Sequence, residues 1–183
     1  MNWFKNMNIP NQLTVIRILL IPLFLLFLFI SKGVFRFFPL LIFIGAAVTD
    51  AIDGHIARRD NLITNFGKFM DPLADKLLTA SAFIAFVEIG YLSSWIVILI
   101  ISREFLISGF RTLAASKGVT IAANPWGKIK TVFQMVLIVV ILIDYTGYIR
   151  FASPMITPLV VIAVLLTVVS GVTYIYDNLN VIK

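Results

Sequence analysis

The chain has 183 residues, of which 60% are hydrophobic, and it contains no cysteine. Its mean hydropathy is +1.01, and its apolar stretches of about 20 residues are long enough to cross a hydrocarbon core of roughly 30 Å, which predicts an integral membrane protein. The lack of cysteine excludes disulfides and thiol catalysis. The formal charge of +6 is scattered among apolar segments, which argues against nucleic acid as a partner.

Apolar segments follow one another along the chain and predict six transmembrane helices, at about residues 13–30, 37–57, 72–90, 93–115, 129–148 and 154–176. Before them, Trp3, Phe4 and Lys5 stand among asparagines, which favours a short N-terminal interfacial helix; a disordered terminus is the alternative. The connecting segments are too short to separate domains. We therefore expect residues 1–183 to form one all-α polytopic membrane domain, a bundle of six transmembrane helices.

Lysines and arginines at the segment ends predict how the chain lies in the membrane. With the N-terminus inside, the inner face carries most of these cations: Lys5, Arg58, Arg59, Lys68, Lys117, Lys128, Lys130 and Lys183. The outer face then carries Lys32, Arg36 and Arg150. We expect a multi-pass protein of the cell membrane, with both termini and the loop after the second helix on the cytoplasmic side.

Four aspartates lie where the second and third segments meet. Asp50 and Asp53 are three residues apart on the second helix, and Asp71 and Asp75 are four apart at the start of the third, with Pro72 expected in its first turn. A carboxylate near the bilayer centre costs roughly 2.5–3.5 kcal/mol. Because a short loop makes the two helices antiparallel neighbours, the four anions converge and need cations between them.

Hard divalent cations meet this need, because carboxylate oxygens favour Mg²⁺, Mn²⁺ or Ca²⁺ over softer metals. Two ions roughly 3.5–4 Å apart would match the architecture of phosphoryl-transfer sites. With no cysteine and with His55 as the one histidine, a zinc site is a poor fit. The alternative is that the aspartates cap helices or pair with neighbouring cations, namely Arg58, Arg59, Lys68 and Lys76.

Small residues near the aspartates leave room for a ligand to approach the helix backbone. Gly54 and Ala57 stand beside the acidic face, and Gly67 lies one turn before Asp71. Each glycine could instead serve helix packing or a turn. Arg58 can donate two parallel hydrogen bonds to a phosphate.

The spacing D-x2-D-G-x2-A-R-x8-G-x3-D-x3-D resembles the signature of the CDP-alcohol phosphotransferase family, and every fixed position is present. The resemblance implies six transmembrane helices, a site for two divalent cations (Mg²⁺ or Mn²⁺) on the cytoplasmic side, and displacement of CMP from a CDP-linked lipid by an alcohol. It also implies a homodimer. Carried over by position, it makes metal ligands of Asp50, Asp53, Asp71 and Asp75, gives Asp75 the added role of general base, and lines a cytidine diphosphate pocket with Asp50, Gly54, Ala57, Arg58 and Gly67.

Two further stretches narrow the choice of alcohol. The stretch from Asn8 to Pro22 resembles the branches of this family that make phosphatidylglycerol phosphate and cardiolipin, and the stretch from Ser102 to Thr131 resembles the former branch. Asn11, Thr14 and Arg17 in the first stretch are candidate contacts of the nucleotide or its pyrophosphate. The alternatives are a helix cap by Asn11 or Thr14, and an Arg17 side chain that extends to the membrane surface.

Cations within and beside the fourth helix are candidates for holding the phosphate of glycerol 3-phosphate. Arg103 and Arg111 are two turns apart on the fourth segment, and Lys128 and Lys130 open the fifth. Arginines within an apolar span seldom lack a partner. Glu104 offers a competing explanation, since it can pair with either arginine. The last two segments are nearly pure aliphatic, and we expect them to supply packing or oligomer contacts.

The predicted reaction transfers the phosphatidyl group of CDP-diacylglycerol to the 1-hydroxyl of sn-glycerol 3-phosphate, within membrane lipids, and yields phosphatidylglycerol phosphate and CMP. One alternative keeps this chemistry with another acceptor: phosphatidylglycerol, inositol phosphate or serine. A different class of protein, a divalent-cation transporter, would also place carboxylates in the membrane. It would need acidic residues along a path through the bilayer, whereas these gather at one end.

Overall fold

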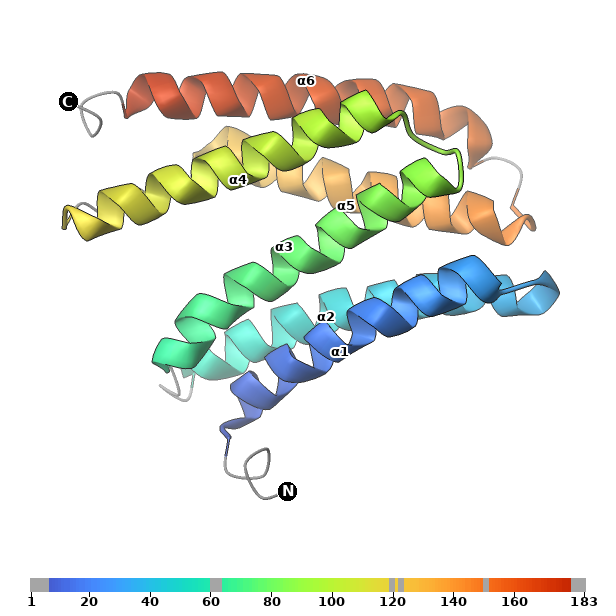
Figure 1. Cartoon of the computed structure of the whole chain (residues 1–183), viewed down its shortest axis with the longest axis horizontal. Helices are drawn as coiled ribbons and strands as arrows, with labels where there is room; N and C mark the ends of the chain where they lie inside the picture. Colours follow the sequence, from blue (N-terminus) through green and yellow to red (C-terminus); the bar gives the residue numbers. More distant parts are fainter. Residues whose placement is uncertain (1–6, 60–63, 119–120, 122–123, 150–151, 179–183) are drawn as a thin grey trace. The chain divides into compact units, whose positions relative to one another are not determined.

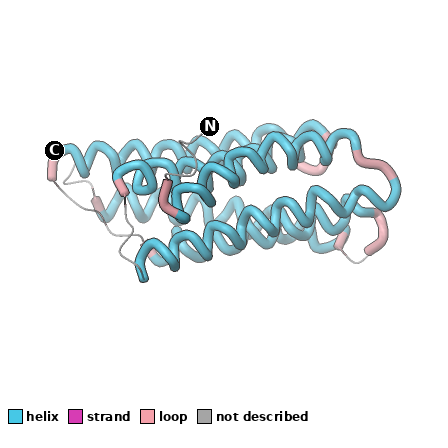
Figure 2. Tube along the Cα trace, turned by 90° about the horizontal axis from the view of Figure 1, so that it is seen from below, coloured by secondary structure: helices cyan, strands magenta, loops and turns pink. Residues whose placement is uncertain are grey.

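The computed structural model is helical throughout the residues that it describes, which are 7–59, 64–118, 121, 124–149 and 152–178. Within the helices, the side chains of residues 51, 53–58, 65–66 and 68–69 are not described. Figure 2 shows helices joined by short loops along this part of the chain. The prediction of an all-α polytopic membrane protein is confirmed, while the interfacial helix predicted before residue 9 lies mostly outside the described residues.

Six α-helices and a short 3₁₀ helix make up the described part of the chain (Figure 1). Their bounds are α1 Ile9–Ile30, η2 Gly33–Phe37, α2 Phe38–Arg59, α3 Asn65–Glu88, α4 Ser94–Ser116, α5 Pro125–Thr146 and α6 Ser153–Asp177. Each α-helix overlaps one of the predicted apolar segments. The starts differ most at α3, which begins seven residues before the predicted 72, and then at α1 and α5, which each begin four residues before the predicted 13 and 129.

Four helical stretches of the described chain are long and apolar enough to cross a membrane: Ile9–Ile30, Gly33–Asp50, Pro125–Thr146 and Ser153–Asp177. The helices α3 and α4 carry more charge than these, because α3 contains Asp71, Asp75 and Lys76, and α4 contains Arg103, Glu104 and Arg111. Their crossing of the bilayer stays a prediction. Four of these charged residues, Asp71, Asp75, Arg103 and Arg111, are ones that the sequence assigns to the site.

The chain divides into two compact units, which are described here one at a time. The first unit comprises Met1–Ala85 with Tyr145–Tyr148, and the second comprises Phe86–Asp144 with Ile149–Lys183. In the first unit α1 packs along α2 (Figure 1), and the rings of Phe24 and Phe43 meet with centroids 6.0 Å apart. The buried face of α1 is polar in its first half and apolar in its second: Asn11, Thr14, Arg17, Ile21, Phe24 and Leu28.

The start of α3 corrects one sequence expectation. Thr64 stands directly before the helix, and its Oγ1 accepts a hydrogen bond of 3.0 Å from the backbone N–H of Gly67, as an N-cap residue does. The helix therefore begins at Asn65, and Pro72 lies inside it rather than in its first turn. A proline there removes one backbone hydrogen bond of the helix and disturbs the preceding turn. Asp71 and Asp75 thus lie well within α3.

In the second unit α4 contacts α6, and α5 is joined to α6 by a hydrogen bond. Gln134 Nε2 on α5 donates to Thr167 Oγ1 on α6 at 3.3 Å, and both side chains are buried. Phe110 on α4 meets the ring of Tyr174 on α6 edge to face, with centroids 6.0 Å apart. The last two helices therefore bring polar and aromatic side chains to the interior of this unit as well as the predicted aliphatic packing.

Candidate active site

Arg17 on α1 forms a buried ion pair with the first aspartate of the signature. Its side chain is 0% exposed, and its Nη1 lies 2.6 Å from Asp50 Oδ1 in the second half of α2. The Asp50 side chain is 43% exposed. A guanidinium buried in this way does not extend to the membrane surface, so the alternative interpretation of Arg17 is wrong. A buried cation needs a partner of opposite charge, and Asp50 supplies it.

Thr14, one turn before Arg17, contacts the third aspartate of the signature. Its Oγ1 lies 2.5 Å from Asp71 Oδ1 and 3.1 Å from the carbonyl oxygen of Pro10. A hydroxyl has a single proton, and a hydrogen bond to an ionised carboxylate is the shorter and stronger kind. Thr14, which is fully buried, therefore donates to Asp71. It caps no helix end, because α1 begins at Ile9.

Asn11, one turn earlier again, meets the start of α3. Its Oδ1 accepts a hydrogen bond of 3.0 Å from the hydroxyl of Thr64. A Cβ added at Gly67 would lie 3.0 Å from this same Oδ1 and 3.5 Å from Asp71 Oδ2. Gly67 is therefore needed for the close approach of α1 to α3, and the space beside it is filled by the Asn11 side chain.

The three polar residues of α1 thus form one row, spaced one turn apart, that meets parts of the signature from two other helices. Because Thr14 and Arg17 are neighbours on the helix face, Asp71 of α3 and Asp50 of α2 lie beside the same stretch of α1. Two of the four aspartates that the sequence predicts to converge therefore contact the same helix, and the convergence of all four stays a prediction. Asp75 follows Asp71 by one turn on α3 and is half-buried.

Several predicted site residues have side chains outside the described ones: Asp53, Gly54, Ala57 and Arg58. Among the side chains that are described, no three of the types Asp, Glu, His or Cys gather as a metal site requires. The donors that are described nevertheless suit a hard divalent cation, since Asp50, Asp71 and Asp75 offer carboxylate oxygens. The metal ligands therefore stay a prediction. The structure supports it to the extent that Asp50 and Asp71 both contact α1.

Glu104 on α4 is the centre of the charged cluster in the second unit. Its Oε1 accepts from Arg103 Nη1 at 3.3 Å and from the ammonium group of Lys130 on α5. The Lys130 side chain is 2% exposed, and that of Glu104 is 25% exposed. The competing explanation from the sequence therefore holds for Arg103, which forms an ion pair with Glu104, and not for Arg111. The structure adds Lys130 as a second partner of Glu104, which the sequence did not predict.

Arg103 extends past two glycines, one on each of the neighbouring helices. A Cβ added at Gly171 of α6 would lie 3.2 Å from Arg103 Cγ, and one at Gly127 of α5 would lie 3.7 Å from Arg103 Nη2. The Nε–H group of Arg103 is buried without a hydrogen-bond acceptor among the described residues. A buried donor without an acceptor is rare in proteins, and it is available to an anionic ligand.

Arg111 has a different partner from the other cations. Its Nε donates to the hydroxyl of Tyr174 at 3.1 Å, and its guanidinium lies 5.3 Å from the centre of the Tyr174 ring. The Tyr174 side chain is buried, whereas Arg111 is exposed and close enough to Arg103 for their charges to interact. A neutral partner leaves the full positive charge of Arg111 available. Lys128, in the first turn of α5, is exposed.

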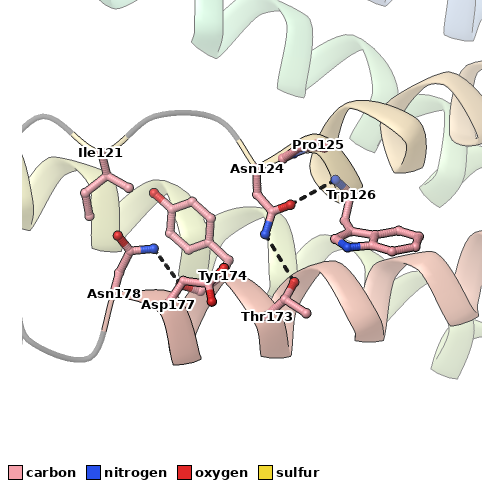
Figure 3. A pocket seen from close by; sticks show the side chains of 8 residues that line it. All are labelled: Ile121, Asn124, Pro125, Trp126, Thr173, Tyr174, Asp177 and Asn178. Atoms are coloured by element: carbon pink, nitrogen blue, oxygen red, sulfur yellow. Dashed lines mark hydrogen bonds between the residues drawn. The ribbon is translucent and has the colours of Figure 1, made fainter.

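A cavity of about 510 Å³ lies beside Tyr174, between the start of α5 and the end of α6 (Figure 3). Asn124 in the cavity lining connects the two helices by hydrogen bonds. Its Oδ1 accepts from the backbone N–H of Trp126 on α5, and its Nδ2 donates to Thr173 Oγ1 on α6. Sequence reasoning assigned no role to this cavity or to Tyr174. The run N-P-W-G-K at residues 124–128 was the sequence feature that could have pointed to it. The cavity is lined by Ile121, Asn124, Pro125, Trp126, Thr173, Tyr174, Asp177 and Asn178.

Comparison with known proteins identifies similar chains that match over most of their length. The family model described as CDP-alcohol phosphatidyltransferase matches residues 7–174. A Bacillus subtilis (strain 168) protein named CDP-diacylglycerol–glycerol-3-phosphate 3-phosphatidyltransferase is 39% identical, over 96% of this chain and 97% of its own. A protein of the same name from Rickettsia typhi is 35% identical, over 91% and 94%. A Mycobacterium tuberculosis (H37Rv) protein named probable phosphatidylglycerophosphate synthase is 37% identical, over 92% and 80%.

Proposed function

The chain belongs to the CDP-alcohol phosphatidyltransferase family, and we propose on this basis that it transfers the phosphatidyl group of CDP-diacylglycerol to the 1-hydroxyl of sn-glycerol 3-phosphate. The products are phosphatidylglycerol phosphate and CMP. The observation that carries the proposal is the similarity to relatives named for this reaction over almost the whole chain. The names of the relatives favour this enzyme over a cation transporter.

The protein is a multi-pass membrane protein, and the sidedness of the site is part of the proposal. The lysines and arginines near the segment ends favour a cytoplasmic position for both termini and for the loop between α2 and α3. The site would then meet soluble glycerol 3-phosphate from the cytoplasm while the lipid substrate enters from the bilayer. A homodimer, which the family resemblance suggests, is part of the same proposal.

Two divalent cations, Mg²⁺ or Mn²⁺, would be held by Asp50, Asp53, Asp71 and Asp75. Arg17 already neutralises part of this negative charge, because it pairs with Asp50. When bound, the cations would supply charge neutralisation for the diphosphate as the bond to CMP breaks. Gly54, Ala57, Arg58 and Gly67 would lie along the cytidine diphosphate, although the space at Gly67 is shared with Asn11.

Asp75 is the proposed general base. Its carboxylate would take the proton of the acceptor's 1-hydroxyl while the hydroxyl oxygen attacks the phosphorus that carries diacylglycerol. The P–O bond to CMP breaks, and CMP leaves with the electron pair. General-base catalysis of this kind contributes about 10²- to 10⁴-fold to a rate.

The cations of the second unit would hold the phosphate of the acceptor. Arg111 has a neutral partner in Tyr174, and Arg103 has a buried Nε–H that finds no acceptor in the described part of the chain, so both guanidinium groups can donate to an anion. Lys130 is buried against Glu104, which favours a supporting role for it over direct contact. Lys128 is exposed and can approach the phosphate from the start of α5.

The reaction is tested by CMP release from CDP-diacylglycerol by the purified protein in detergent. CMP should form only when glycerol 3-phosphate and either Mg²⁺ or Mn²⁺ are both present. A panel of acceptors that includes serine, inositol phosphate and phosphatidylglycerol should give far lower rates. Faster CMP release with another acceptor would reassign the substrate, and cation flux into liposomes without CMP release would support a transporter.

A further inference from the structure

The row Asn11, Thr14 and Arg17 carries contacts that nucleotide binding does not explain. Two of the three side chains reach carboxylates of the signature, and all three are buried. Thr14 is 0% exposed, so its hydroxyl is covered by the protein. A fully covered hydroxyl that donates to a carboxylate acts on that carboxylate rather than on a ligand in solution.

We propose that Thr14 and Arg17 are positioning residues, which orient the carboxylates of Asp71 and Asp50 for binding of the divalent cations. This inference rests on the proposed function, since it concerns the same site. It assigns to α1 the outer shell of the metal centre: Thr14 holds one oxygen of Asp71, and Arg17 holds one oxygen of Asp50. The second oxygen of each carboxylate would then be the one that binds a cation.

The geometry favours this role on three grounds. The contact from Thr14 Oγ1 to Asp71 Oδ1 is 2.5 Å, within the range of strong hydrogen bonds to carboxylates. Thr14 is held in turn by its place on α1, which packs along α2. Asn11 fixes the approach of α3 to α1 at Gly67, one turn before Asp71. Both aspartates are therefore oriented from a single rigid helix.

Outer-shell hydrogen bonds of this kind have a measurable effect on metal affinity. Removing such a partner typically weakens metal binding about 10- to 100-fold, because the ligand carboxylate loses its fixed orientation. The effect on Mn²⁺ binding can be measured without substrate or turnover. A residue with a purely structural role would lower the unfolding temperature and leave the affinity of the folded protein unchanged.

The decisive variant is Thr14→Val, which removes the hydroxyl and keeps the shape of the side chain. Mn²⁺ binding to the purified full-length protein, followed by electron paramagnetic resonance of the free ion, should weaken about 10- to 100-fold. Thr14→Ser, which keeps the hydroxyl, should restore binding to near the wild-type level. Thr79→Val on α3 is the matched control, because the Thr79 hydroxyl contacts only the backbone carbonyls of Asp75 and Lys76 among its described contacts.

Two outcomes would overturn the proposal. One is Mn²⁺ binding by Thr14→Val at the wild-type affinity, and the other is an equal loss in Thr14→Val and Thr79→Val. If the valine variant does not fold, Thr14→Ala poses the same test with a residue that favours helices. Wild-type protein that binds Mn²⁺ but releases no CMP with glycerol 3-phosphate would refute the proposed reaction alone, whereas wild-type protein without Mn²⁺ binding would refute both.

Discussion

Among the described side chains, the buried cation Arg17 of the first unit pairs with the carboxylate of Asp50, whereas in the second unit the carboxylate of Glu104 pairs with the cations Arg103 and Lys130. The two arrangements differ in which partner water can reach. Arg17 is fully buried and its partner Asp50 is 43% exposed. Glu104 is 25% exposed, and its partner Lys130 is 2% exposed. In both cases the least exposed member of the pair is the cation.

This difference indicates what each region is ready to bind. The partly exposed members of the first region are carboxylates, which would attract metal cations, and the second region has exposed cations in Arg111 and Lys128, which would attract a phosphate. The pair of opposite charge within each region reduces repulsion among like charges and fixes their orientation. A substitution can therefore remove either the binding group or the group that holds it, and the two kinds of change should be distinguishable.

The largest expected effect comes from the carboxylate region. Asp75→Asn removes the proposed base while keeping the shape of the side chain, so the rate of CMP release should fall about 10²- to 10⁴-fold. Asp144→Asn is a matched control on α5, where the carboxylate accepts from the hydroxyl of Tyr91 at 2.9 Å, and it should keep near-normal activity. An Asp75→Asn enzyme with more than about a tenth of the normal rate would contradict the base assignment.

Removing the carboxylate from the cationic region should mainly destabilise the fold. Glu104→Gln removes the negative charge that pairs with the buried Lys130, and breaking a buried ion pair in this way costs on the order of 3 kcal/mol. Thermal unfolding in detergent should detect the loss. The double variant Glu104→Gln with Lys130→Met should recover part of it, because the buried charge of Lys130 is then removed, whereas Arg103 still lacks the charge of Glu104.

Arg17→Met sharpens the same comparison from the first unit. It leaves Asp50 unpaired, but that carboxylate is exposed enough for water to solvate it, so the loss of stability should be smaller than for Glu104→Gln. An equal or larger loss for Arg17→Met would contradict the distinction between the two pairs.

The sequence predicts the helices well, and the signature aspartates by their spacing, because both depend on local patterns. Hydropathy places every α-helix, but the start of α3 depends on the cap by Thr64, which the apolar pattern does not include. The ion-pair partners depend on contacts between distant residues. Glu104 could reach Arg103 or Arg111 from the sequence alone, and the packing of α5 adds Lys130 instead of Arg111.

The contacts of Asn11, Thr14 and Arg17 on α1 are a further example of what the sequence alone does not predict. A sequence shows that Thr14 and Arg17 lie one turn apart, but it does not show whether they face a ligand or a carboxylate. Their partners lie 57 positions away for Thr14, at Asp71, and on a second helix for Arg17, at Asp50. The side chains of Asp53, Gly54, Ala57 and Arg58 are not described, so their roles stay predictions.

Arg111→Met tests the binding group of the cationic region. Loss of a hydrogen bond to a charged group is worth about 1.5–3 kcal/mol, so KM for glycerol 3-phosphate should rise about 10- to 100-fold with a smaller change in kcat. The KM for CDP-diacylglycerol should stay the same. Lys117→Met, which removes an exposed cation just after α4, is the control and should leave both values near normal. An unchanged KM for glycerol 3-phosphate in Arg111→Met would remove Arg111 from the acceptor site.

The smallest expected effect comes from Gly171→Ala on α6. This variant should move the Arg103 side chain without destabilising the helix. The added Cβ would lie 3.2 Å from Arg103 Cγ and 3.9 Å from its Nε, so the guanidinium must shift by a few tenths of an ångström. A weakened hydrogen bond to the acceptor phosphate should raise KM for glycerol 3-phosphate about two- to fivefold. Alanine stabilises a helix relative to glycine by about 0.5–1 kcal/mol. This gain offsets the cost of moving Arg103, so the stability of the protein should change little.

Gly109→Ala on α4 is the control for this change, because nothing lies within 4 Å of a Cβ at that position. It should gain the same helix stabilisation and leave KM unchanged. If Gly171→Ala also leaves KM unchanged, then Arg103 either adapts without loss or does not contact the acceptor, and Arg103→Met decides between the two. A normal KM in Arg103→Met would leave Arg111 as the arginine that binds the phosphate, with Arg103 serving only to hold Glu104.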